Sequence, residues 1–160
     1  MSLSRFHDAQ QARHSGFDAA LAELRAGRKR THWIWYVFPQ LRGLGHSPAA
    51  ELYGLNGVTE ADEYLHDARL RANLLLAAST VKEQLEAGVS LDELMGARID
   101  ALKLVSSMTL FGAIARRFGP QEESVEAGRL ADVADAVLGA AARTGYRPCT
   151  FTLDALRAAP

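Results

Sequence analysis

The amino-acid sequence predicts an all-α protein, a single compact multi-helix domain over residues 1–160 with a central buried helix around residues 100–118. Three observations predict this class. Apolar residues recur mostly at helical spacing, glycines and capping residues divide them into short segments, and no pair of strands joined by hairpin chemistry is visible. A chain of 160 residues that is 48% hydrophobic is also long and apolar enough to bury one core.

Two short helices are expected before residue 30. Residues 4–13 fit the first helix, with Gly16 as the break after it. The second helix has four apolar residues at i, i+3, i+4 and i+7, with Ser15 as its expected N-cap and Gly27 after its end. These four residues are Phe17, Ala20, Leu21 and Leu24.

The segment from Trp33 to Phe38 is aromatic and β-branched, and it fits two structures. Its propensity is that of a strand, but a single buried strand has no visible partner, and Thr31 could instead cap a helical turn. Ser47 followed by Pro48 is a typical N-cap and first helical residue, which predicts a short helix from Pro48 to about residue 53.

Residues 60–86 carry apolar side chains at helical spacing and fit one bent helix or two. The weak point of this pattern lies near His66 and Asp67, where polar residues interrupt it. We expect Thr59 to cap the start and Gly88 to end the segment.

Ser90 with Glu93 three residues later predicts a capping box and a brief helix that closes at Gly96. The next helix, of about twenty residues, is stopped by Gly119 and Pro120. Its apolar residues are spread around most of the helix circumference, which predicts that this helix is buried on most sides. They are Leu102, Leu104, Val105, Met108, Leu110 and Phe111.

A last long helix is expected from about Glu122 to Arg143, followed by Gly145. Thr152 is expected to cap a terminal turn. The side chains predicted to point inward from the long helix are Leu130, Val133, Val137, Leu138 and Ala141.

The charge balance excludes some classes of partner. Eighteen basic and nineteen acidic residues give a formal net charge of -1, so no global field attracts nucleic acid or an anionic membrane. The apolar runs fall far short of the roughly 20 residues that span a bilayer, and the first residues lack the apolar region of a secretory signal. The lone Cys149 forms no internal disulfide, so we expect a cytoplasmic protein.

Residues 27–47, GRKRTHWIWYVFPQLRGLGHS, form the first candidate site. Basic side chains lie beside glycines at a predicted helix start, a combination that could hold a phosphate or carboxylate. The candidate ligand residues here are Lys29, His32, Trp33, Trp35, Gln40, Arg42, Gly43, Gly45, His46 and Ser47. The alternative is that the aromatic residues are core and the basic residues are a solvated surface. Polar residues threaded between aromatics need buried partners or face a cleft.

Residues 100–111, DALKLVSSMTLF, form the second candidate site. Asp100, Lys103 and Ser107 fall at i, i+3 and i+7, hence on one helix face, with Ser106 beside them and Thr109 further round. Lys103 and the hydroxyls could line a pocket and bind an anion or a sugar hydroxyl. Alternatively, Asp100 caps the helix, the hydroxyls bond to the previous turn and Lys103 reaches solvent.

Established catalytic and metal motifs are absent from the sequence. There is no HExxH, GxSxG or CxxC pattern, and the histidines do not fall at paired metal-ligand spacing, apart from the loosely separated His7 and His14, so we expect neither a metal site nor a cofactor. Candidates for acid/base chemistry are His32, His46 and Asp100.

At these two blocks the sequence resembles a bacterial family known as domain of unknown function 1810. The family pattern A-L-x-E-L-x-x-G-x-K-x-x-H-W-x-W-x-x-F-P-Q is matched from Ala20 to Gln40, after an AQ at Ala9 and Gln10. G-L-G-x-S is matched by Gly43–Ser47, and the L-K-L-x-S-S-M-T-L-F block by the segment that ends at Phe111.

The resemblance covers nearly the whole chain and implies a small all-helical domain whose activity is not established. The calpastatin label that some members carry does not fit, because calpastatins are largely disordered whereas this composition can build a core. The family pattern has two aspartates before L-K-L, but Ile99, Asp100 and Ala101 provide one carboxylate, which argues against a mechanism that needs two acids there.

Our leading hypothesis is that both blocks form one pocket for a small anionic or nucleotide-like ligand, with hydrolase or transferase activity at a glycosidic or phosphate centre as the natural chemistry. Lys103, Arg42 and Lys29 would meet the negative charge, and Trp33 or Trp35 would stack on a flat moiety. The alternative is a non-catalytic module that binds a protein partner or forms a homodimer. Exposed tryptophans would favour this alternative. RNA binding is a third hypothesis, against which the neutral charge argues.

Overall fold

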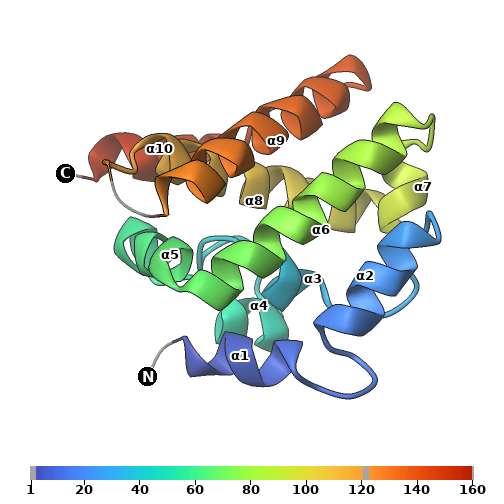
Figure 1. Ribbon diagram of the computed structural model, residues 1–160, viewed down its shortest axis with the longest axis horizontal. Coiled ribbons are helices and arrows are strands. Elements are labelled where there is room, and N and C mark those ends of the chain that lie inside the picture. Colours follow the sequence, from blue (N-terminus) through green and yellow to red (C-terminus); the bar gives the residue numbers. More distant parts are fainter. Residues whose placement is uncertain (1–2, 121–122, 160) are drawn as a thin grey trace.

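The predicted helical pattern is realised as ten helices in the computed structural model, which describes residues 3–120 and 123–159 (Figure 1). The helices are α1 (Ser4–Gln10), α2 (Phe17–Arg25), α3 (Ile34–Val37), α4 (Pro48–Tyr53), α5 (Gly57–His66), α6 (Ala68–Glu86), α7 (Leu91–Met95), α8 (Arg98–Arg116), α9 (Ser124–Arg143) and α10 (Thr150–Ala158). No strand is present in this described part, so the all-α class and the single compact domain are confirmed.

The helix α8 lies at the centre of the fold, as its apolar pattern predicts. It packs against α9 and α5, and it also contacts α3, α7 and α10. In Figure 1 the long helices α6 and α9 cross in front of it. Leu104, Met108 and Phe111 are fully buried, but Ile99 is 62% exposed and Leu102 is 44% exposed. One short face at the start of α8 therefore remains open to solvent.

Several predicted helix ends are confirmed. The Ser47 hydroxyl accepts the first-turn N–H of α4, and the Ser90 hydroxyl does the same for α7, which ends at Gly96 in a left-handed conformation. The break near residue 67 divides the long segment into α5 and α6, because the Asp67 carboxylate caps α6 by accepting the N–H of Leu70.

Other predicted caps are wrong. α2 begins after Gly16 rather than Ser15, because the Ser15 carbonyl instead accepts the Tyr36 hydroxyl. Thr59 lies inside α5, where the Glu60 carboxylate takes over the capping role by accepting the Asn56 N–H. Thr152 is fully buried inside α10 rather than at its start.

The segment around the tryptophans forms a single helical turn, α3, which Thr31 does not cap. The extended residues after it make one isolated parallel bridge between Leu41 and Leu55. In this bridge Leu55 donates to the Gln40 carbonyl at 2.9 Å and accepts the Arg42 N–H at 2.9 Å. The bridge fixes the loop from residue 40 to 47 against the start of α5.

α9 begins at Ser124, and the predicted start at Glu122 lies outside the described residues. Leu130, Val137 and Ala141 are buried as predicted, whereas Val133 and Leu138 are partly buried against the core. Over residues 3–120 and 123–159, no helix is both long and apolar enough to cross a membrane.

Candidate functional site

One cavity of about 490 Å³ brings the two candidate segments together. Residues from Trp35 to Ala50 form one wall and the open face of α8 forms the other. The lining residues are Trp35, Gln40, Leu44, Gly45, His46, Ser47, Ala50, Ile99, Leu102, Lys103 and Ser106. Three other hollows in the described part of the chain have larger volumes, of about 530, 550 and 670 Å³, but none contains residues of both segments. Apolar walls with a few convergent polar groups are typical of small-molecule sites.

The α8 wall follows from helical spacing. Leu102 and Lys103 follow Ile99 by three and four residues, and Ser106 follows them by four and three, so these side chains lie on one face. Ser106 donates its hydroxyl proton to the Leu102 carbonyl at 3.1 Å, which leaves its oxygen lone pairs as acceptors. Of the predicted polar seam on α8, Lys103 and Ser106 therefore line the cavity, whereas Ser107 is fully buried.

The opposite wall is a loop whose path depends on glycine. Gly43 and Gly45 have φ angles of +106° and +86°, which side chains rarely adopt. A Cβ on Gly43 would lie 2.8 Å from the Phe151 ring, so the loop approaches α10 closely at this point. Gln40 stabilises the same turn from within by donating its amide Nε2–H to the Leu44 carbonyl at 3.0 Å.

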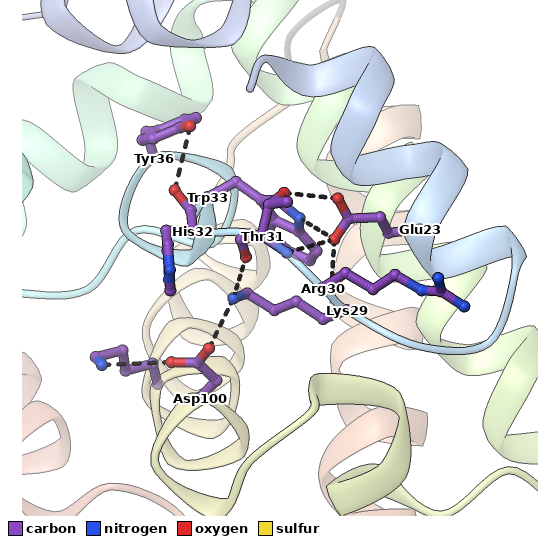
Figure 2. A network of polar contacts seen from close by, with 9 residues as sticks. Glu23, Lys29, Arg30, Thr31, His32, Trp33, Tyr36 and Asp100 are labelled. Atoms are coloured by element: carbon purple, nitrogen blue, oxygen red, sulfur yellow. Dashed lines mark hydrogen bonds and ion pairs between the residues drawn. The ribbon is translucent and has the colours of Figure 1, made fainter. Parts of the chain in front are cut away.

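The Asp100 carboxylate pairs with two lysines, of which Figure 2 labels Lys29. Asp100 Oδ2 is 2.8 Å from Lys29 Nζ, and Asp100 Oδ1 is 3.4 Å from Lys103 Nζ. The Lys29 side chain is 4% exposed and also donates to the Thr31 carbonyl at 2.5 Å, whereas the Lys103 side chain is 17% exposed. Lys29 is therefore held by its partners, and Lys103 keeps donors for a ligand.

Glu23 on α2 fixes the loop that carries Lys29 (Figure 2). Its carboxylate accepts the Arg30 N–H at 2.6 Å, the Thr31 N–H at 2.9 Å and hydroxyl at 2.6 Å, and the Trp33 Nε1–H at 3.0 Å. Partial burial of the carboxylate raises the pKa, but these hydrogen bonds prevail and lower the pKa of Glu23 from 4.5 to about 2. The ionised carboxylate therefore stabilises the segment between α2 and α3.

Trp35 is the tryptophan that lines the cavity. Lys103 Nζ lies 5.3 Å from the centre of the Trp35 ring, a cation–π contact that occupies one ring face. Trp35 Nε1 is buried and has no hydrogen-bond partner among the described residues. A buried N–H without a partner is unfavourable, so a ligand whose acceptor atom reached Trp35 Nε1 would bind more tightly.

Several predicted site residues lie outside the cavity because the fold uses them elsewhere. Trp33 is fully buried in the core and cannot stack on a ligand, and Lys29 is committed to Asp100. Ser107 is fully buried without a hydrogen-bond partner among the described residues. Thr109 donates to the Val105 carbonyl at 2.8 Å and accepts the Cys149 N–H at 3.2 Å, so it anchors the chain before α10.

His32, Arg42 and Gly43 also do not line this cavity. Arg42 borders a different hollow beside Glu51, and Gly43 packs against Phe151. His32 is exposed, and within the described residues its ring makes no hydrogen bond or ion pair. In the alternative interpretation of α8, the Asp100 cap is wrong, because Ala97 occupies the N-cap position, whereas the hydroxyls of Ser106 and Thr109 do bond to the previous turn.

The structure adds residues that spacing alone did not select. Leu44, Ala50, Ile99 and Leu102 line the cavity, and Glu23 holds residues 30–33, which precede the cavity-lining Trp35. Glu23 was visible as the acidic position of the family pattern, but its role depends on a turn that brings residues 30–33 back to α2. Among the described residues, no group of three or more His, Cys, Asp or Glu side chains is placed to hold a metal ion.

The described residues form a helical domain in which two segments that are distant in sequence line a common cavity. The chain belongs to the family described as "Protein of unknown function (DUF1810)", whose model matches residues 1–142. It is also similar to the conserved hypothetical protein Rv1873 from Mycobacterium tuberculosis. The crystal structure of that protein matches with 36% identity and a TM-score of 0.71, over 96% of this chain and 94% of that chain. No match was found among curated proteins. The family membership that the two sequence blocks indicated is thus confirmed.

Proposed function

We propose that the cavity between the residue 35–50 segment and α8 binds a small anionic or nucleotide-like ligand. The observation that carries this proposal is that the two blocks, more than 50 residues apart in sequence, line one cavity that includes Lys103. A volume of about 490 Å³ lies within the range of small-molecule sites. Leu44, Ile99 and Leu102 would contact the apolar part of the ligand, and Lys103 its negative charge.

The local charge supports an anion. Lys29 and Lys103 share the single carboxylate of Asp100, so this cluster carries one net positive charge. An ammonium group whose only carboxylate lies at 3.4 Å keeps most of its capacity to bind a second anion.

Hydrolase or transferase activity would require an acid or base in the cavity. Of the three candidates, His46 lines the cavity, His32 does not, and Asp100 is engaged by two ammonium groups. His46 is therefore the residue to test first for catalysis, with Ser47 beside it as the hydroxyl group.

Tryptophan fluorescence and thermal unfolding test the binding proposal, because Trp35 lines the cavity and a ligand of the native state raises its stability. Adenosine 5′-monophosphate, inorganic phosphate and small carboxylates are the probes. We expect at least one probe to raise the melting temperature, and Lys103→Gln to remove the shift. Lys82→Gln on α6 is the matched control, because it removes a lysine remote from the cavity. A shift that is unchanged in Lys103→Gln, or no shift with any probe, would contradict the proposal.

The alternative is a protein-interaction or dimerisation module. The exposed apolar residues Ile99 and Leu102 favour it, since they border the cavity and could contact a second surface. The expectation that exposed tryptophans anchor such an interface has less support, because Trp33 is fully buried and Trp35 partly buried. Sedimentation of the parent protein and of Leu102→Asp would distinguish the two functions, since a dimer built on this face would dissociate in the variant.

A further inference from the structure

The charge of the cavity limits the charge of its ligand. The two lysines and Asp100 leave one positive charge, and Lys103 is the group of this cluster that lines the cavity. Arg42 borders another hollow, and Arg98 lies over the Tyr146 ring. One negative charge on the ligand is therefore matched, whereas each further charge gains little.

The single net positive charge of the lysine and aspartate cluster, more than the number of donors, favours a carboxylate over a phosphate group. The Ser106 hydroxyl already donates to a backbone carbonyl, and the Ala50 N–H in the first turn of α4 donates to the Ser47 hydroxyl oxygen. Lys103, the hydroxyl proton of Ser47 and the exposed ring of His46 remain as donors from the two walls, and the enclosed Trp35 Nε1–H is a further donor without a partner among the described residues. A carboxylate has two acceptor oxygens, while a phosphate monoester has three and carries up to two charges.

The cavity also offers acceptors. Gln40 is 7% exposed, and its Nε2 is engaged by the Leu44 carbonyl, so the amide is oriented and its Oε1 accepts no hydrogen bond from the described residues. The Ser106 oxygen is a second acceptor. These groups can accept a hydrogen bond from an N–H or O–H of the ligand, while Leu44, Ile99 and Leu102 contact its apolar part.

We infer that the preferred ligand is a singly charged apolar carboxylate with a neighbouring hydrogen-bond donor, the chemistry of an apolar amino acid acylated on its nitrogen. This inference rests on the proposed function and narrows it from anions in general to one class. The carboxylate binds Lys103 and Ser47, the amide N–H binds Gln40, and the apolar side chain packs on Leu102 and its neighbours.

Isothermal titration with N-acetyl-L-leucine and three matched compounds tests the inference. N-acetyl-L-leucinamide lacks the charge, 4-methylpentanoate lacks the N–H, and adenosine 5′-monophosphate carries phosphate. We expect the amide to bind about tenfold or more weakly than the acid, since a charged hydrogen bond is lost, and 4-methylpentanoate to bind severalfold more weakly. The nucleotide is expected to bind more weakly than the acid.

Lys103→Gln should abolish the preference for N-acetyl-L-leucine over N-acetyl-L-leucinamide, whereas Lys82→Gln should keep it. The melting temperatures of both variants without ligand show whether they fold. If the parent protein binds the amide as tightly as the acid, the inference is wrong. Tighter binding of adenosine 5′-monophosphate in a Lys103-dependent manner overturns the inference and leaves the proposed function standing. Absence of Lys103-dependent binding by every compound overturns both.

Discussion

Replacement of Glu23 by glutamine tests how much the Glu23 carboxylate contributes to the free energy of unfolding through the segment between α2 and α3. Four hydrogen bonds from Arg30, Thr31 and Trp33 converge on the carboxylate. The glutamine amide has the same shape, but only one of its two terminal atoms is an acceptor oxygen, and that oxygen is uncharged. Its NH₂ group would face groups that are themselves hydrogen-bond donors. The variant therefore loses the charge-assisted bonds without creating a large cavity.

The pKa gives the magnitude and its pH dependence. A pKa that falls from 4.5 to about 2 on folding corresponds to roughly 3 kcal/mol at about 1.4 kcal/mol per pH unit, and solvent screening of this partly exposed group reduces the value to about 1–2 kcal/mol. Because the pKa is lower in the folded state, this stabilisation is complete above pH 4.5 and is lost as the pH falls toward about 2.

Urea unfolding at pH 7 and at pH 3 measures this effect. We expect Glu23→Gln to lower the free energy of unfolding by about 1–2 kcal/mol at pH 7, and the difference from the parent protein to shrink at pH 3. Glu83→Gln is the control, since Glu83 is an exposed residue of α6 whose side chain has no hydrogen bond in the described structure. Equal losses in the two variants at pH 7, or a Glu23→Gln loss that does not depend on pH, would refute the reasoning.

Three further variants test neighbouring features. Lys29→Met should lower the free energy of unfolding in urea by ~2–3 kcal/mol, because it breaks a buried ion pair, although Asp100 keeps its second lysine. Gly96→Ala should lower the free energy of unfolding by about 1–3 kcal/mol in the same assay, since φ is +81° and the Cβ would lie 2.9 Å from the Lys29 carbonyl oxygen. An unchanged urea midpoint would contradict this. Ile99→Asp places a carboxylate four residues before Lys103 at an exposed site, so anion affinity should fall in titrations while thermal stability stays unchanged or rises.

The fold was predictable where local chemistry determines it. Ser47, Ser90 and Gly96 act through their own backbone neighbourhood, so their positions in the sequence were sufficient to place helix ends. The cap of α5 was not predictable in this way. Glu60 caps that helix while it pairs with Arg5 of α1, 55 residues away, and such a partner is defined only by the tertiary fold.

The candidate site was predictable to the level of two segments. Aromatic, glycine and basic residues identified one wall, and a polar seam on an apolar helix identified the other, and the structure brings these walls together. The assignment of single residues was weaker, because spacing does not reveal burial. Trp33 and Trp35 are two residues apart in one segment, yet one is fully buried in the core and the other lines the cavity.

The two lysines show most clearly what decides between structural and binding roles. Both contact Asp100, and each lies over a tryptophan ring, Lys29 over Trp33 at 5.1 Å and Lys103 over Trp35 at 5.3 Å. Their difference is access, since the Lys29 ammonium is enclosed and held by a carbonyl as well as the carboxylate. Lys29 thereby satisfies Asp100 and joins the loop before α3 to the start of α8. Because Asp100 is already paired with Lys29, Lys103 can exchange its longer contact with Asp100 for a contact with a ligand, and the carboxylate stays paired.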